Sequence, residues 1–186
     1  MPTIQWRGFD PPGTESCEIS ERRTGWRFVG RAVTTGDWPA RLSYAISLSS
    51  HWVTRAVRII GTVGEDVIDL TITRSSAGHW AMNGTPHPAL EGANDIDLGF
   101  SPATNTCAIR RLGPALDTAR ATTAAWLDPT DWALKPLRQT YTQTGPNTWA
   151  YRSPTTGYST QLTVNNDGFV TDYPGLWVAV PQGGAG

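Results

Sequence analysis

Hydrophobic and polar residues alternate with a period of two along much of the chain. Residues 68–73 show the pattern most clearly, because isoleucine and leucine there alternate with aspartate and threonine. The same alternation occurs in residues 42–48 and 158–164. Strands of an antiparallel sheet that bury one face have this pattern. We therefore predict several half-buried antiparallel strands.

Turn-forming residues separate these runs. Residues 76–78, 144–147 and 165–168 contain glycine together with serine, asparagine, proline or aspartate, and each lies between two strand-like runs. A further dipeptide, Asn83-Gly84, is a strong turn signal. We predict a β-hairpin at each of the three longer turns.

One alanine-rich stretch, Pro114–Leu127, fits two structures. Its length allows a helix of three turns, but the threonines and Trp126 in its second half also suit a strand. Periodicity does not decide between a helix and a strand here.

The predicted fold class is all-β, mainly antiparallel, with at most one or two short helices. About ten strands in one meandering sheet must curl, split or close because strands twist. We expect a single curled sheet that forms a half-open barrel. At 186 residues the chain has the length of one domain, which we place at residues 1–180, followed by a flexible tail at 181–186.

Composition and charge narrow the classes of function. The net charge is −1, which gives no long-range positive field, so we expect no nucleic-acid partner. The longest apolar stretch, Leu176–Val180, is far too short to span a bilayer. The chain as given starts without a secretory signal, so we expect a cytoplasmic location. These features leave the oligomeric state open.

Cysteine and histidine usage predicts no cofactor and no metal site. Cys17 and Cys107 are 90 residues apart without a CxxC motif, which favours two buried free thiols. The three histidines are scattered without metal-ligand spacing.

The densest polar segment contains paired carboxylates and paired guanidinium groups. Asp95 and Asp97 are two residues apart, so they share one face of an extended segment. Arg110 and Arg111 are adjacent and point to opposite faces of any strand, so at most one of them readily meets both aspartates.

Two interpretations of this segment remain. The carboxylates could perform acid–base chemistry or hold a cation. Alternatively, an arginine neutralises a carboxylate while Asn105 pins a loop. We favour the structural interpretation, because paired charges in β-proteins more often close a fold than catalyse.

Aromatic residues are the remaining feature. The chain has nine tryptophans against five tyrosines and four phenylalanines. Such rings stack on sugar rings and line apolar cavities, although any single one of them is more often a core residue. Trp80, Tyr141 and Tyr173 are our aromatic candidates for contact with a ligand.

Residues 95–112 resemble the signature of the bacterial family called Putative glycolipid-binding, which has a form close to DxDLxxTPxTNTLPIRRL. Supporting matches extend over nearly the whole chain: Trp6, Glu15, Trp52-Val53-Thr54-Arg55, Gly78-His79-Trp80, Gln139-Thr140-Tyr141 and Tyr173-Pro174-Gly175-Leu176-Trp177. The chain departs from the signature by having Cys107-Ala108 in place of Leu-Pro, and Ala93 where a cysteine is frequent. The resemblance implies a curled antiparallel sheet, similar in shape to the carriers of bacterial lipoproteins, and binding of a glycolipid.

Three functions follow as hypotheses. The first is non-enzymatic binding of an amphipathic small molecule such as a glycolipid, with acyl chains on the concave face of the sheet and the head group at its rim. Its candidate ligand-binding residues are Trp80, Asp95, Asp97, Asn105, Arg110, Arg111, Tyr141 and Tyr173. The second is an enzyme that acts on a small or lipid-like substrate through the same aspartates and arginines. The third is a protein-interaction module with a filled core.

Overall fold

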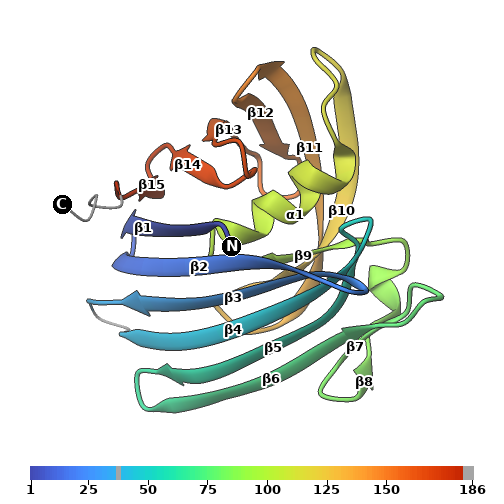
Figure 1. Ribbon diagram of the computed structural model, residues 1–186. Helices are drawn as coiled ribbons and strands as arrows, with labels where there is room; N and C mark the ends of the chain where they lie inside the picture. The colour runs from blue at the N-terminus through green and yellow to red at the C-terminus, as the bar shows by residue number, and fades with distance from the viewer. Residues whose placement is uncertain (37–38, 182–186) are drawn as a thin grey trace.

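The computed structural model describes residues 1–36 and 39–181, which form fifteen strands, one α-helix and one 3-10 helix (Figure 1). The first half of the chain contains β1 (Thr3–Phe9), β2 (Pro12–Arg22), β3 (Gly25–Thr34), β4 (Ala40–Ser49), β5 (Thr54–Val63), β6 (Asp66–Arg74), β7 (Trp80–Met82), β8 (Thr85–Pro86) and η1 (Pro88–Leu90). The second half contains β9 (Asp95–Leu98), α1 (Ala103–Leu112), β10 (Ala119–Leu127), β11 (Leu134–Gly145), β12 (Thr148–Ser153), β13 (Tyr158–Val164), β14 (Val170–Tyr173) and β15 (Trp177–Ala179). Of the predicted tail at 181–186, residues 182–186 lie outside the described residues.

All fifteen strands belong to one sheet, in the order β8-β7-β6-β5-β4-β3-β2-β1-β15-β14-β13-β12-β11-β10-β9. Neighbouring strands are antiparallel except β9 and β10, which are parallel. The sheet curls but does not close (Figure 1), which confirms the predicted fold class. The number of strands is higher than predicted, because strands as short as β7 and β8 cannot show an alternation.

The three predicted hairpins are present. They join β6 to β7, β11 to β12 and β13 to β14, all antiparallel. At the turn between β7 and β8, Asn83 and Gly84 have φ angles of 49° and 81°, a conformation that asparagine and glycine tolerate best. The ambiguous stretch Pro114–Leu127 contains a strand, β10, and no helix.

The structural interpretation of the polar segment placed Asn105 in a loop, and this placement was wrong. Both arginines and Asn105 belong to helix α1, which lies in the hollow of the curled sheet (Figure 1). Seven consecutive residues, Ala103–Ile109, are buried. Polar residues such as Thr104 and Asn105 are among those buried, so the sequence of α1 does not divide into an apolar buried face and a polar exposed face.

The half of the hollow over β3–β6 is a packed core. Phe28, Ile46, Ile59 and Ile72 are fully buried there, and the core continues through Trp6 to Phe169, whose rings meet edge to face at 5.7 Å. This half is filled by side chains of the protein.

A smaller cluster of buried residues lies over β11–β14 and against α1: Ala108, Ile109, Tyr141, Trp149, Tyr151, Leu162, Val164 and Val170. The indole nitrogen of Trp6 donates a hydrogen bond of 2.6 Å to the carbonyl oxygen of Val170, which ties β1 to β14.

Two further predictions concern the cysteines and the membrane. Cys17 and Cys107 are both buried and free, as predicted. Among the described residues, no helix has the length and apolar character needed to cross a bilayer.

Candidate functional site

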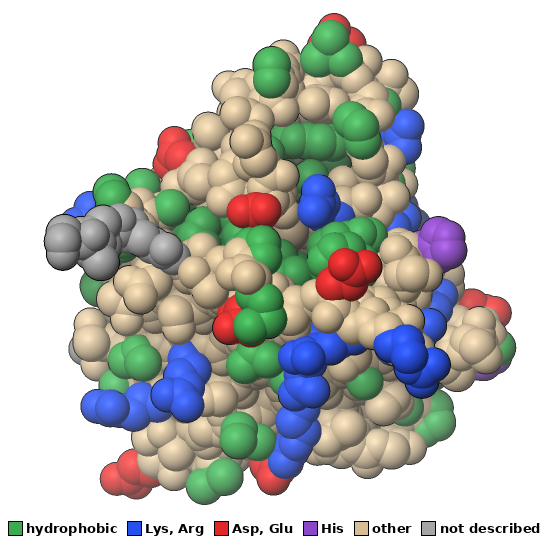
Figure 2. All heavy atoms as spheres, in the orientation of Figure 1, with side chains coloured by type: hydrophobic (Ala, Val, Ile, Leu, Met, Phe, Trp, Pro, Cys, Tyr) green, Lys and Arg blue, Asp and Glu red, His purple; other side chains and the backbone are tan. Residues whose placement is uncertain are grey.

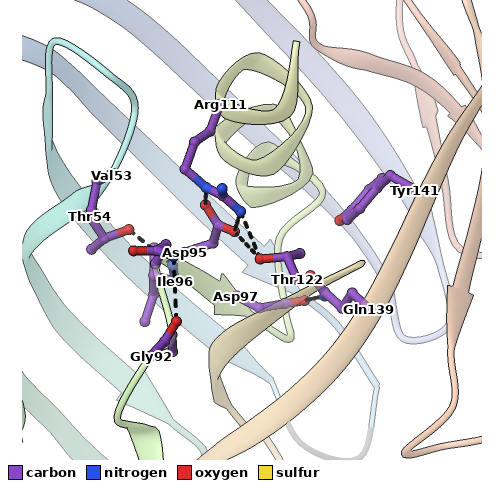
Figure 3. Close-up of polar contacts among 12 residues, drawn as sticks. Val53, Thr54, Gly92, Asp95, Ile96, Asp97, Arg111, Thr122, Gln139 and Tyr141 are labelled. Carbon is purple, nitrogen blue, oxygen red and sulfur yellow. Dashed lines mark hydrogen bonds and ion pairs between the residues drawn. The ribbon is translucent and has the colours of Figure 1, made fainter. Parts of the chain in front are cut away.

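Asp95 of β9 forms an ion pair with Arg111 of α1 (Figure 3). The Nε and Nη2 atoms of Arg111 donate to the two carboxylate oxygens at 2.7 and 2.6 Å. The hydroxyl of Thr122 on β10 donates to Asp95 Oδ2 and accepts a hydrogen bond from Arg111. Burial lowers the pKa of Arg111, but its bonds to Asp95 and the charge of Asp95 outweigh burial, so the pKa lies above its usual value.

This arrangement links three elements that follow one another in the chain, β9, α1 and β10. Because both oxygens of Asp95 accept hydrogen bonds from within the protein and only 1% of the side chain is exposed, its geometry is that of a fold-closing pair. The ion pair of Asp95 and Arg111 therefore agrees with the structural interpretation of the polar segment, in which an arginine neutralises a carboxylate.

Asp97 has a different environment, although it lies on the same face of β9, as its spacing from Asp95 predicts. Its Oδ2 atom accepts a hydrogen bond of 2.6 Å from the amide nitrogen of Gln139 on β11 (Figure 3). The same nitrogen lies 3.1 Å from the hydroxyl of Tyr151. Burial raises the pKa of Asp97 to about 6, against the lowering effect of the hydrogen bond from Gln139. Asp97 can therefore change its charge close to neutral pH.

Four tyrosines from four consecutive strands form a tyrosine cluster beside Asp97. Ring centroids lie 5.1 Å apart for Tyr141 and Tyr151, 6.3 Å for Tyr151 and Tyr173, and 6.2 Å for Tyr158 and Tyr173. Tyr141 and Tyr151 are buried, whereas Tyr158 and Tyr173 are half-buried. Burial raises the pKa of Tyr141, Tyr151 and Tyr173, so their hydroxyl groups keep their protons and can donate hydrogen bonds.

A small open pocket of about 70 Å³ lies between this cluster and the start of α1. Its lining combines the polar residues Asp97, Ser101 and Asn105 with the aromatic and apolar residues Tyr173, Leu176 and Trp177. The amide nitrogen of Asn105 donates to the hydroxyl of Tyr141 at 2.9 Å, which links the pocket to the tyrosine cluster. We call this site the β9–β14 pocket.

Of the eight predicted ligand-binding residues, Asp97, Asn105 and Tyr173 line the β9–β14 pocket, and Tyr141 lies behind it. Trp80 does not line it. Its ring is 2% exposed in the large core, and its indole nitrogen donates to the carbonyl oxygen of Ala93 at 3.1 Å.

Arg110 also lies away from this pocket. Its guanidinium carbon is 5.1 Å from the centre of the Trp52 ring. It lines a separate open pocket of about 300 Å³, together with Trp149, Asn147 and Asn165.

Sequence reasoning missed Gln139, Tyr151 and Tyr158 as parts of this site. Gln139 had a recognisable signal, because it occupies a position of β11 that alternation assigns to the buried face, between Leu137 and Tyr141. A polar side chain at such a position needs a hydrogen-bonding partner inside the protein, and that partner is Asp97.

A second buried polar group was also missed. Glu15 of β2 accepts hydrogen bonds of 2.5 Å from the hydroxyls of Tyr44 and Ser101, both at its Oε1 atom. Burial raises the pKa of Glu15 to about 8, so this carboxyl group is neutral at pH 7. Ser101 also accepts a hydrogen bond from the backbone nitrogen of Ala103, and the group therefore fixes the start of α1 against β2 and β4.

Comparison with protein-family models matches residues 3–179 to the family described as Putative glycolipid-binding. The chain belongs to this family. The match covers nearly the whole sequence and confirms the resemblance found in residues 95–112. The family name suggests a glycolipid as ligand for its members, and this member carries the β9–β14 pocket within the matched region.

A solved structure supports the assignment of the fold. The chain is similar to the crystal structure of a DUF1089 family protein from Pseudomonas aeruginosa, with a TM-score of 0.76 and 26% identity. The similarity covers 87% of this chain and 90% of the other. A search of curated proteins finds no match.

Proposed function

We propose that the protein binds an amphipathic ligand, a glycolipid, without chemical conversion, and that the β9–β14 pocket receives part of its sugar head group. The observation that carries the proposal is that Asp97 and Asn105 line the same pocket as Tyr173 and Trp177. Sugars present hydroxyl groups at their edges and C–H groups on their faces. Carboxylate and amide groups match the edges, and aromatic rings match the faces.

The size of the pocket limits what enters it. A volume of about 70 Å³ corresponds to roughly two water molecules, so it accommodates one edge of a sugar ring. The rest of the head group then lies against the half-buried rings of Tyr158 and Tyr173.

The location of the acyl chain differs from the original hypothesis. The concave face over β3–β6 is filled by Phe28, Ile46, Ile59 and Ile72, so the proposal does not place an acyl chain there. Leu176 and Trp177 at the pocket offer the apolar surface where the chain leaves the head group.

The first experiment is native mass spectrometry of the purified protein, with extraction and identification of any bound lipid. The second is calorimetric titration with an alkyl glucoside, used below its micelle concentration, against wild type and Asp97→Asn. Loss of a charged hydrogen-bond acceptor costs roughly 1.5–3 kcal/mol, so Asp97→Asn should weaken binding about tenfold to a hundredfold.

Asp172→Asn is the matched control, because Asp172 is the exposed neighbour of Tyr173 on β14. It changes the same charge outside the pocket and should bind like wild type. Wild-type binding should also strengthen as the pH rises through about 6, because Asp97 then becomes a carboxylate. A protein that carries no lipid and binds neither lipid extracts nor alkyl glucosides contradicts the proposal.

The enzymatic alternative would act through Asp97, because a carboxyl group with a pKa of about 6 can exchange a proton near neutral pH. The titration separates the two functions. If the wild type releases a modified glucoside during the titration and Asp97→Asn does not, the enzymatic alternative is correct.

A further inference from the structure

The outer face of β1–β6, which points away from α1 and the core, carries a distinctive set of exposed side chains. Strand pairing places Val29 of β3 beside Ala45 of β4, which lies beside Arg58 of β5. Two residues further along the face, Arg31 of β3 lies beside Ser43 of β4, which lies beside Ile60 of β5. Inward positions of the same strands, such as Phe28 and Ile46, are buried. The alternation therefore assigns every second residue of these strands to one continuous surface, which we call the outer face.

The outer face is strongly basic although the chain as a whole has a net charge of −1. Figure 2 shows arginine side chains gathered over β3–β6. The exposed arginines at outward positions are Arg7, Arg22, Arg27, Arg31, Arg41 and Arg58. Outward positions of β1–β6 carry two carboxylates, Glu18 and Asp69, of which Asp69 is paired with Arg58.

Apolar side chains are interspersed among these arginines. Val29, Ile60 and Val67 are 44, 47 and 78% exposed at outward positions of β3, β5 and β6. Phe9 at the end of β1 is 46% exposed, and the guanidinium carbon of Arg7 lies 5.3 Å from the centre of its ring. These side chains give the basic surface an apolar component.

The outer face also contains an open groove of about 460 Å³ that crosses β1, β2 and β3. Its lining includes Gln5, Ser16, Glu18, Val29 and Arg31. Small polar side chains on β1 and β2 thus leave space next to the basic and apolar residues of β3.

We propose that the outer face of β1–β6 docks on an anionic lipid surface. Arginine side chains reach the phosphate and glycerol groups of anionic lipids, while Val29, Ile60 and Val67 enter the boundary between head groups and acyl chains. A second copy of the chain is a poor partner, because two outer faces with six exposed arginines each would repel one another. The apolar residues also favour a lipid surface over nucleic acid, which offers phosphates without an adjoining apolar layer.

This proposal is independent of the β9–β14 pocket, which lies on the opposite side of the sheet. The test is co-sedimentation of the protein with vesicles of phosphatidylglycerol and phosphatidylcholine, compared with vesicles of phosphatidylcholine alone. We expect binding to the anionic vesicles only, and we expect added salt to weaken it.

The double variant Arg31→Gln/Arg41→Gln removes two charges of the outer face, one on β3 and one on β4. Each basic residue near an anionic surface contributes about fivefold to binding, so the variant should bind roughly 30-fold more weakly. Both residues are exposed, so the fold should be retained, and circular dichroism checks this.

Arg138→Gln/Arg152→Gln is the matched control, because it removes two exposed arginines from outward positions of β11 and β12. It should bind anionic vesicles like wild type. Equal losses in the two double variants, binding to phosphatidylcholine alone, or no binding to any vesicle would overturn the proposal. Sedimentation equilibrium without vesicles tests whether the outer face instead forms a dimer. A wild-type dimer that is lost in Arg31→Gln/Arg41→Gln would overturn the proposal and assign the face to self-association.

Discussion

Arg110 and Arg111 are neighbours in the sequence but have opposite environments in the structure. Arg111 points to β9 and β10, where its guanidinium group meets the carboxylate of Asp95 and the hydroxyl of Thr122. Arg110 points outward to the ring of Trp52. Because successive residues of an α-helix differ by about 100° in direction, an adjacent pair of identical residues can have unrelated roles.

We predict that Arg111→Ala destabilises the protein by about 3 kcal/mol or more, because it leaves the Asp95 carboxylate buried without its partner. Arg110→Ala should cost less than about 1 kcal/mol, since it removes one exposed contact with an aromatic ring. Urea denaturation measures both values. Similar losses for the two variants would contradict the structural role assigned to Arg111.

Glu15 gives a prediction about pH. Its pKa is raised from 4.5 to about 8 by burial, so between these values the unfolded chain releases a proton that the folded protein keeps. The contribution of Glu15 therefore makes the folded state less stable as the pH rises from about 4.5 to 8, by up to about 5 kcal/mol.

Glu15→Gln mimics the neutral carboxyl group and should remove this dependence. Thermal denaturation at a series of pH values should show that the melting temperature of the variant exceeds that of wild type by an amount that grows from pH 5 to pH 9. Glu18→Gln, three residues further along β2, is the control, and a parallel shift of both profiles would show that Glu15 is not the group responsible.

At the scale of the elements, the sequence predicts strands well and helix α1 poorly, for a physical reason. A strand with one buried face alternates, and the alternation in residues 68–73 is visible without knowledge of the partner strands. The burial of Ala103–Ile109 depends on a hollow that forms only when the whole sheet curls. The same limit applies to the site, because Asp97, Gln139 and Tyr158 come together from three separate strands.

The contact between β3 and β4 depends on a missing side chain. A Cβ atom at Gly30 would lie 2.2 Å from Cζ of Tyr44, so the ring of Tyr44 occupies the space above this glycine. The ring then reaches Glu15 with its hydroxyl group.

We predict that Gly30→Ala displaces Tyr44 and destabilises the protein by about 2 kcal/mol, within the range observed for overpacked cores. Val29→Ala, at the exposed neighbouring position, should have a smaller effect on the free energy of unfolding. Near-ultraviolet circular dichroism should also change for Gly30→Ala, because it reports the packing of aromatic rings. An unchanged spectrum and an unchanged free energy of unfolding would contradict this prediction, because they would show that the core accommodates the added methyl group.

At the scale of the whole molecule, stability should differ along the sheet. Strands β3 and β4 each pair with two neighbours over nine or more residues, whereas β8 has two residues and one neighbour. Native-state hydrogen exchange should therefore show slow exchange in β3 and β4 and fast exchange in β7 and β8. Uniform protection across these strands would indicate that the sheet opens only as a unit.

The pairing of β1 with β15 has one more consequence. Trp6 faces Ala179 across that pair, so the first and last strands lie side by side in the middle of the sheet, while β8 and β9, which follow each other in the chain, lie at its two ends. A circularly permuted chain that begins at β9, passes through a linker from β15 to β1 and ends at β8 would follow the sheet strand by strand from one end to the other. Apart from the parallel pair of β9 and β10, the fold is in this sense a meander that starts in the middle, and the segment around η1 is the natural place to open it.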